Sequence, residues 1–383
     1  MATQKLFYID PYQTDFTAQV LRCEPGKHGW DVVLDRTCFY PEGGGQPYDT
    51  GVLGGVRVTE VHERGEEIVH SCEGPVEGEV SGRIDWARRF DFMQQHSGEH
   101  IVSGIIHGKY GYENVGFHMG AELVTIDVGG ELTDDQVREI ESLANAYLWA
   151  NASIEITWPS AEELETLTYR SKKALSGDVR IVRFPEADCC ACCGTHVRQA
   201  GEVGLVKLLS CQKFREGVRI ELVCGKRALD YCSAILAQNT QVSQLLSAKP
   251  MATGAAVARM KEENETLNYR IVGLEARVFA DTAARYAGAE RVLHFEPNLS
   301  SDGVRRLAVA IMEQTGGIVA VCSGSDGEGY KYCLGQTDGD LRALTKEWNA
   351  TLNGRGGGKP FFSQGSVSAA REAIETFWNE KGI

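Results

Sequence analysis

Short alternating runs of apolar and polar residues dominate the first part of this 383-residue chain. Segments such as WDVVLD, GVRVTEV and EEIVHS place apolar side chains at every second position, as in strands with one buried face. Glycines between these runs are typical of tight turns. The pattern predicts a compact antiparallel β-barrel or sandwich over residues 1–85.

The pattern changes at Asp85, after which apolar residues recur three and four positions apart as far as the segment HGKYG. This spacing predicts a long helix that stops at the glycines of that segment. Two further helices are expected after Thr133 and Ser160, because each is followed three residues later by Gln or Glu in a capping-box arrangement. Strand-like runs such as ELVTIDV, DVRIVRF and GVRIELV separate or follow these helices. Residues 86–228 are therefore predicted to form an α+β domain.

The second half of the chain divides into two predicted segments. Residues 229–286 contain one proline, Pro250, and their apolar residues follow near-heptad spacing from Met260 to Val278, which predicts a helical hairpin or a coiled-coil arm. Residues 287–383 mix strand and helix patterns and are predicted to form a small α/β domain. Its glycine-rich segment NGRGGGKPFFSQGS is expected to be a loop between the last two helices. The fold class expected for the whole chain is α+β, with several domains.

Composition indicates where the protein resides and which chemistry its cysteines favour. The first ten residues, MATQKLFYID, lack the features of a signal peptide, and no segment offers about 18 uninterrupted apolar residues, so cytoplasmic residence without a membrane span is expected. Four of the 12 cysteines crowd into DCCACCGTH, which favours reduced, metal-binding thiols over a disulfide framework. The net charge of -14 argues against indiscriminate coating of nucleic acid, although it allows a local basic face.

Two histidines stand four residues apart on the predicted long helix. His96 and His100 therefore lie on one helix face, which is a common half of a zinc site but also occurs by chance. About ninety residues later Cys192 and His196 repeat the spacing in CCGTH, where Gly194 gives the chain freedom to turn. Three imidazole nitrogens and one thiolate form a tetrahedral set suited to zinc. The sequence predicts one Zn²⁺ per chain.

Glu99 introduces an alternative type of metal site. The string HSGEH also fits the H-x-x-E-H pattern of inverted zinc peptidases, in which the glutamate is the general base. Such a site requires a carboxylate as its third ligand, whereas the second pair here is Cys and His. Glu99 also points about 100° around the helix from His100. We therefore expect Glu99 to face solvent.

These motifs resemble those of the editing domain of alanyl-tRNA synthetases and of the free-standing alanyl-tRNA editing proteins. The family signatures are H-x-x-x-H, C-G-G-T-H and F-Y-P-E-G-G-G-Q, beside HSGEH, CCGTH and FYPEGGGQ in this chain. The segment GRGGGKPFFSQG is similar to G-G-G-K-P-x-x-A-Q-G of the synthetase's C-terminal domain, often called DHHA1. Together the motifs cover nearly the whole chain, as in the long form of the editing protein. Cys193 replaces a glycine, leaving a thiol that could compete for the metal, and Ser363 replaces an alanine.

The resemblance implies a zinc-dependent trans-editing hydrolase that deacylates alanine tRNA mischarged with serine, and with glycine as a second substrate. No aminoacylation is expected, because the family places that module before the editing domain and only about 85 residues precede that domain here. The implied zinc ligands are His96, His100, Cys192 and His196. No catalytic side chain is assigned, and the pocket candidates are Gln46 and His118. The implied substrate-binding residues are Glu42, Gly43, Gly44, Gly45 and Gln46 near the pocket, with Gly356, Gly357, Gly358 and Lys359 in the terminal motif.

A second class of function stays open at this point. Closed four-ligand zinc sites are usually structural, so a zinc-stabilised tRNA-binding protein without catalysis fits the same ligands. Whether the zinc activates water or positions the substrate is also open. The apolar spacing of the arm, or the C-terminal domain, provides a candidate interface for a homodimer.

Overall fold

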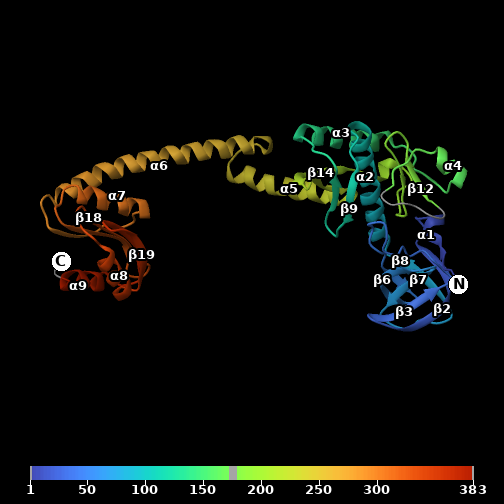
Figure 1. Ribbon diagram of the computed structural model, residues 1–383, viewed down its shortest axis with the longest axis horizontal. Helices are drawn as coiled ribbons and strands as arrows, with labels where there is room; N and C mark the ends of the chain where they lie inside the picture. Colours follow the sequence, from blue (N-terminus) through green and yellow to red (C-terminus); the bar gives the residue numbers. More distant parts are fainter. Residues whose placement is uncertain (1, 172–178, 382–383) are drawn as a thin grey trace. The chain divides into compact units, whose positions relative to one another are not determined.

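The computed structural model describes residues 2–171 and 179–381 (Figure 1). These residues fall into two compact units, Met1–Gln241 and Val242–Ile383. Both units contain helices and sheets, so the predicted α+β multi-domain class is confirmed. The finer division into four segments stays a prediction. Within the described residues, every helix is too short or too polar to cross a membrane.

Six strands of the first 84 residues close into a barrel in the order β2, β3, β7, β6, β5, β8. Their alternation of buried and exposed positions, as in EVSGRI of β8, points every second side chain into the barrel. The short strand β1 pairs with β4 beside this barrel, and helix α1 follows β1. The bounds are β1 Gln4–Lys5, α1 Leu6–Ile9, β2 Asp15–Gly26, β3 Gly29–Leu34, β4 Arg36–Thr37, β5 Gly51–Leu53, β6 Val56–Arg64, β7 Glu67–Cys72 and β8 Glu79–Ile84.

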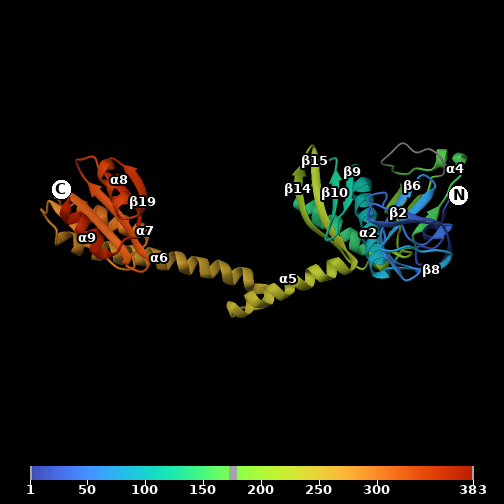
Figure 2. The same ribbon diagram turned by 90° about the horizontal axis from the view of Figure 1, so that it is seen from below.

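Helix α2, Trp86–Tyr110, leads from the barrel into the rest of the first unit (Figure 1). It ends as predicted at Gly111, whose φ of 71° is the left-handed conformation of a helix C-cap. Ile101 and Val102 of α2 are fully buried in a core shared with the sheet β14-β15-β10-β9, whose strands lie side by side in Figure 2. A second sheet, β11-β12-β13, also belongs to this unit.

The two predicted capping boxes are present, at Thr133 before α3 and at Ser160 before α4. In each, the hydroxyl accepts from a backbone N–H three residues on, which explains why these helices start where they do. The bounds are β9 Asn114–Met119, β10 Val124–Val128, α3 Asp134–Ala150, β11 Glu155–Thr157, α4 Ala161–Thr166, β12 Ile181–Phe184, β13 Asp188–Ala191, η1 Ala200–Val203, β14 Val206–Phe214 and β15 Gly217–Cys224.

Two long helices follow, α5 over Gly225–Leu245 and α6 over Thr253–Ala284. Pro250 opens the short 3-10 helix η2, Pro250–Ala252, between them, as expected for a residue without a backbone N–H. The apolar stripe of α6 that was noted in the sequence is exposed, with Met260, Leu267 and Leu274 each half-exposed or more.

The C-terminal sheet has the order β16-β17-β18-β20-β19. Apolar residues pack on both of its faces, with α7 and the end of α6 on one face and α8 and α9 on the other. The bounds are β16 Arg291–Phe295, α7 Ser301–Met312, β17 Ile318–Ser325, β18 Gly329–Gln336, α8 Arg342–Thr351, β19 Gly354–Lys359, β20 Phe362–Val367 and α9 Arg371–Glu380.

The prediction of a loop for NGRGGGKPFFSQGS was wrong. This segment forms the hairpin of β19 and β20, in which Gly356 pairs with Gly365 and Gly358 with Ser363. Glycine has low strand propensity, but here the hydrogen bonds to β20 fix the extended backbone. Strand β19 is one of the two edge strands of the sheet.

Candidate metal centre

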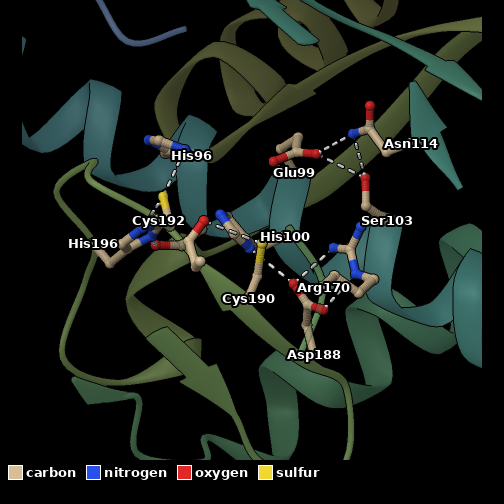
Figure 3. A network of polar contacts seen from close by, with 12 residues as sticks. His96, Glu99, His100, Ser103, Asn114, Arg170, Asp188, Cys190, Cys192 and His196 are labelled. Atoms are coloured by element: carbon tan, nitrogen blue, oxygen red, sulfur yellow. Dashed lines mark hydrogen bonds and ion pairs between the residues drawn. The ribbon is translucent and has the colours of Figure 1, made fainter. Parts of the chain in front are cut away.

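Four side chains from two distant segments meet in the first unit (Figure 3). His96 and His100 come from α2, and Cys192 and His196 come from the loop after β13. Their ligand atoms all lie within 4.8 Å of one another, and the Cys192 Sγ atom is 3.5 Å from His96 Nε2 and 3.4 Å from His196 Nε2. The three imidazoles are buried and Cys192 is partly buried. The structure thus brings together the two pairs that were noted from their spacing.

Gly194 allows the loop to approach the helix. A Cβ atom at this position would lie 2.1 Å from Cε1 of His96, so a larger residue would push the ring or the loop away. The Gly194 amide donates to Cys192 Sγ over 3.3 Å, which favours the thiolate form. Arg180 completes the loop, because its Nη1 atom donates to the carbonyl oxygens of Cys192 and Gly194 over 2.7 and 2.9 Å.

The glycine-rich loop between β4 and β5 delivers Gln46 to the same centre. Gly43 and Gln46 exchange two backbone hydrogen bonds, and Gly44 and Gly45 form the two-residue turn between them with φ of 60° and 83°. Both values favour glycine, which explains the run of glycines. The Gln46 side chain is fully buried, and its Oε1 atom accepts from His96 Nδ1 over 3.0 Å.

A carboxylate holds the second histidine of α2. Asp188 Oδ2 lies 2.8 Å from His100 Nδ1, and Arg170 donates from Nε and Nη2 to the two oxygens of Asp188 over 2.8 Å each (Figure 3). Burial alone would raise the pKa of Asp188, but His100 and Arg170 outweigh it and lower that pKa to about 2. Asp188 is therefore charged. The sequence analysis missed Asp188 and Arg170, since no spacing connects them with the ligands.

Ser97 holds the third histidine. Its Oγ atom lies 3.2 Å from His196 Nδ1 and accepts from the backbone N–H of Val197 over 3.2 Å. Each of the three imidazoles therefore has its Nδ1 atom engaged by the protein. This leaves the three Nε2 atoms for the centre, and such outer partners fix the orientation of metal-bound imidazoles.

The electrostatics of the cluster suit a cation. Burial opposes ionisation of Cys192, but the neighbouring His96, His100 and His196 outweigh burial and hold the pKa of the thiol well below its usual range. Burial lowers the pKa of His196 to about 3, which keeps this imidazole neutral. Burial opposes a charge on His100, but Cys192 and Asp188 outweigh burial and raise the pKa of His100 well above its usual range. Zinc binds a thiolate and neutral imidazoles, so it would displace the His100 proton.

Glu99 does not face solvent, so that expectation was wrong. The side chain is only 2% exposed, because strand β9 covers this face of α2. Its Oε1 atom accepts from Ser103 Oγ over 2.7 Å and from Asn114 Nδ2, the side chain of the first residue of β9 (Figure 3). The rotation of about 100° away from the histidines therefore points Glu99 into a second buried interface.

The other predicted site residues lie at different distances from the centre. Strand β9 carries His118, which is exposed, while the neighbouring Phe117 stacks on His96 with ring centroids 5.1 Å apart. Cys193 is exposed, and the additional thiol that groups with His100 and Asp188 is Cys190. Glu42, Gly44 and Gly45 are exposed beside the buried Gln46, whereas Gly356, Gly357, Gly358 and Lys359 belong to β19 of the second unit.

Comparison with protein families gives two matches. Residues 9–88, which include all the strands of the barrel, match the family described as "tRNA synthetases class II (A)". Residues 179–221, which include Cys192 and His196, match the "Threonyl and Alanyl tRNA synthetase second additional domain".

Individual relatives align over nearly the whole chain. The alanine–tRNA ligase of Pyrococcus abyssi is 32% identical over 98% of this chain and 43% of its own length. The alanyl-tRNA editing protein AlaX-L of Pyrococcus horikoshii is 29% identical over 97% of this chain and 96% of its own length. The chain therefore spans less than half the length of the ligases. Among solved structures, the C-Ala domain of Aquifex aeolicus alanyl-tRNA synthetase is 19% identical and covers 24% of this chain and 92% of its own, with a TM-score of 0.22.

Proposed function

Because the chain is a homologue of the long-form alanyl-tRNA editing proteins, we propose that it is a trans-editing deacylase. Its substrates would be alanine tRNA mischarged with serine and, secondarily, with glycine, in the cytoplasm where tRNA is charged. One observation carries this proposal: the loop FYPEGGGQ and the motifs HSGEH and CCGTH, which are far apart in the sequence, meet at a single centre. The four candidate ligands without the glycine-rich loop would support only a metal site.

Alanine, serine and glycine are difficult to separate by binding alone. Discrimination by one methyl or hydroxyl group is worth about 1 to 3 kcal/mol, so a separate hydrolytic site that recognises the wrong amino acid is useful. We propose that His96, His100, Cys192 and His196 hold one zinc ion per chain. Bound zinc would supply a Lewis acid that can hold the amino or hydroxyl group of the substrate, or a water of lowered pKa.

Gln46 would act in two ways in this site. Its Oε1 atom orients His96 and also accepts from the backbone N–H of Thr195 over 3.0 Å, while Nε2 donates to Thr195 Oγ1 over 2.8 Å. One N–H of a glutamine amide remains after that bond. We propose that this donor faces the aminoacyl ester, and that the exposed Gly44 and Gly45 border the terminal adenosine.

The test is deacylation of alanine tRNA charged with serine, glycine or alanine, with the metal content measured in the same preparation. We expect about one zinc per chain, and hydrolysis of the serine ester at least about 100-fold faster than that of the alanine ester. Equal rates on the three esters would overturn the substrate assignment. Zinc and tRNA binding without hydrolysis would support the second candidate, a non-catalytic tRNA-binding protein whose zinc is structural.

We also propose a homodimer through α6. The half-exposed residues Val257, Met260, Leu267, Ile271, Leu274 and Val278 continue a heptad in which Asn264 occupies the remaining position. β-branched residues at one core position, leucine at the other and a single asparagine are typical of two-stranded coiled coils. Sedimentation of the full chain and of Leu274→Glu tests this interface. A monomeric parent protein would overturn it.

A further inference from the structure

Phe117 contacts two of the segments that meet at the candidate metal centre. Its ring stacks on the His96 imidazole, with ring centroids 5.1 Å apart and an angle of 30° between the two planes. The same ring abuts Gly45 of the glycine-rich loop, since a Cβ atom on Gly45 would lie 2.7 Å from Phe117 Cε1 and closer still to Cδ1. One aromatic ring therefore touches both a candidate metal ligand of α2 and the loop that carries Gln46.

These contacts form a closed circuit of four residues from three elements. Gln46, the residue after Gly45, accepts from His96 Nδ1 through its Oε1 atom over 3.0 Å. His96 stacks on Phe117, and Phe117 in turn contacts Gly45. The imidazole of His96 is thus held at Nδ1 by a hydrogen bond and on one face by an aromatic ring, which leaves Nε2 for a metal. Removal of the ring would release the loop and this face of the imidazole together.

Strand β9 is anchored in a way that fixes the position of the Phe117 ring. It is an edge strand of its sheet, so it has a neighbouring strand on one side only, where Phe117 pairs with the fully buried Ile126 of β10. Strand β9 also packs against α2, beside which it lies in Figure 1. Its first residue, Asn114, donates from Nδ2 to Ser103 Oγ of α2 over 2.9 Å and to the buried carboxylate of Glu99. This network ties β9 to the helix of the candidate ligands, three residues before the ring.

Two neighbouring glycines of the loop differ in their relation to the ring. Gly44 and Gly45 have φ of 60° and 83°, so the backbone conformation favours glycine at both positions. Only Gly45 also meets Phe117, because a Cβ atom on Gly44 would have nothing within 4 Å. The two positions therefore separate the cost of a strained backbone from the cost of contact with the ring.

We propose that Phe117 is a positioning residue for deacylation. It holds the His96 imidazole and the Gln46 amide in the relative position in which the metal centre and the remaining Gln46 N–H reach the same ester. A displacement of about 1 Å at a reacting group can cost about 100-fold in rate, so this support matters although the ring itself carries no reactive atom. The inference rests on the proposed function, but the arrangement of His96 can also be tested on the metal centre alone.

The first test replaces the ring and measures rate and metal binding in the zinc-loaded, full-length protein. Phe117→Leu keeps an apolar side chain without the aromatic face, and we expect kcat on the serine ester to fall about 100-fold with KM within about threefold of the parent. Zinc affinity should fall only about two- to tenfold, because all four candidate ligands remain. Phe117→Tyr keeps the ring and should restore most of the rate. Val115→Ala shortens an exposed side chain of the same strand and is the matched control.

The absorption spectrum of the cobalt-substituted protein provides a readout that does not depend on the reaction. The visible bands of Co²⁺ respond to the geometry of its ligands, so Phe117→Leu should shift them, whereas Phe117→Tyr and Val115→Ala should not. If Phe117 only stabilised the fold, Phe117→Leu would lower the thermal midpoint but leave the bands and kcat per bound zinc unchanged, and this result would overturn the proposal. If the parent protein hydrolyses none of the esters, the proposed function fails, and the cobalt bands still decide whether Phe117 positions His96.

A double-mutant cycle tests the contact between the ring and the loop. Gly45→Ala should lower kcat at least about tenfold more than Gly44→Ala, because it adds the contact with Phe117 to the cost of a positive φ. In a Phe117→Ala background the two glycine substitutions should have effects within about threefold of each other. Equal effects in the parent background, or a persistent difference without the ring, would mean that Phe117 does not hold the loop.

Discussion

The metal centre of the first unit and a cavity of the C-terminal unit differ in how their buried polar groups are satisfied. At the metal centre, the Nδ1 atoms of His96, His100 and His196 all have protein partners. In the cavity between α8 and β19, the buried hydroxyl of Thr345 has none among the described residues. The first site is therefore organised by partners within the protein, whereas the second leaves a buried hydroxyl without a hydrogen bond.

The largest effect is expected from Cys192→Ala, which removes the thiolate from the ligand set. Zinc affinity should fall by more than about 100-fold, since the loss of an outer partner alone costs about 10- to 100-fold. Elemental analysis after dialysis and the deacylation rate on the serine ester measure the effect. Cys193→Ala is the matched control, because this exposed neighbour lies outside the ligand group and should leave both quantities unchanged. The opposite pattern would transfer the ligand role to Cys193.

The four candidate ligands were accessible from the sequence because each pair is local. The four-residue spacing on α2 follows from helix geometry, and the bounds of α2 follow from its periodicity and from Gly111. The meeting of the two pairs was inferred from chemistry, since Cys192 and His196 lie almost a hundred residues further on. Local spacing thus predicted each pair of ligands, and the four-ligand coordination that zinc favours predicted that the two pairs meet.

The remaining features depend on tertiary contacts that no local pattern encodes. Glu99 was expected at the surface because helix geometry gave its direction on α2 but did not reveal that strand β9 packs against that face of the helix. Asp188 contacts His100 and is itself held by Arg170, and both come from segments whose spacing carries no metal signature. The Gly356 segment was expected to be a loop, because glycine propensity does not reveal the partner strand β20.

A smaller effect is expected from Asp188→Asn, which leaves the four candidate ligands in place and changes only the group that hydrogen-bonds to His100. The amide can still accept from His100 Nδ1, but it loses the charge that Arg170 and His100 stabilise. We expect about 10- to 100-fold weaker zinc binding at neutral pH, measured by competition with a chelator. Asp31→Asn, which changes a carboxylate of the barrel outside the ligand group, is the control. Equal affinities of Asp188→Asn and the parent would mean that the charge has no role in orientation.

The pH dependence of stability is expected to reveal a buried histidine that has no metal role. His70 lies inside the barrel unit, where Nε2 contacts Thr37 Oγ1 at 2.8 Å and Nδ1 lies 3.0 Å from the carbonyl oxygen of Val32. Burial lowers its pKa to about 4. As the pH falls, this histidine takes up a proton near pH 6.5 in the unfolded chain but only near pH 4 in the folded chain. Its contribution to stability is therefore fully present above pH 6.5 and is lost on acidification.

Between pH 7 and pH 5 this difference in pKa corresponds to a loss of about 2 kcal/mol in the free energy of unfolding. Denaturation of the parent and of His70→Gln at both pH values isolates this loss, because the candidate metal ligands contribute equally to both proteins. The variant should be less stable at pH 7 but should lose about 2 kcal/mol less on acidification. An identical pH dependence of the two proteins would show that His70 is protonated in the folded barrel.

The smallest effect is expected from substitutions of two glycines of β19 that line the cavity of the C-terminal unit. Gly356→Ala places a methyl group against the Tyr332 hydroxyl and the backbone of β20, and so disturbs the hydrogen bond from Tyr332 to Asn349, at a cost of about 1 to 3 kcal/mol in the stability of this unit. Gly357→Ala meets no atom within 4 Å and should change stability by less than about 0.5 kcal/mol. Neither substitution should alter the zinc content, because all four candidate ligands belong to the other unit. Thermal denaturation and elemental analysis of both variants measure these effects. Equal destabilisation by the two substitutions would mean that backbone pairing along β19, and not the contact with Tyr332, sets the shape of the cavity.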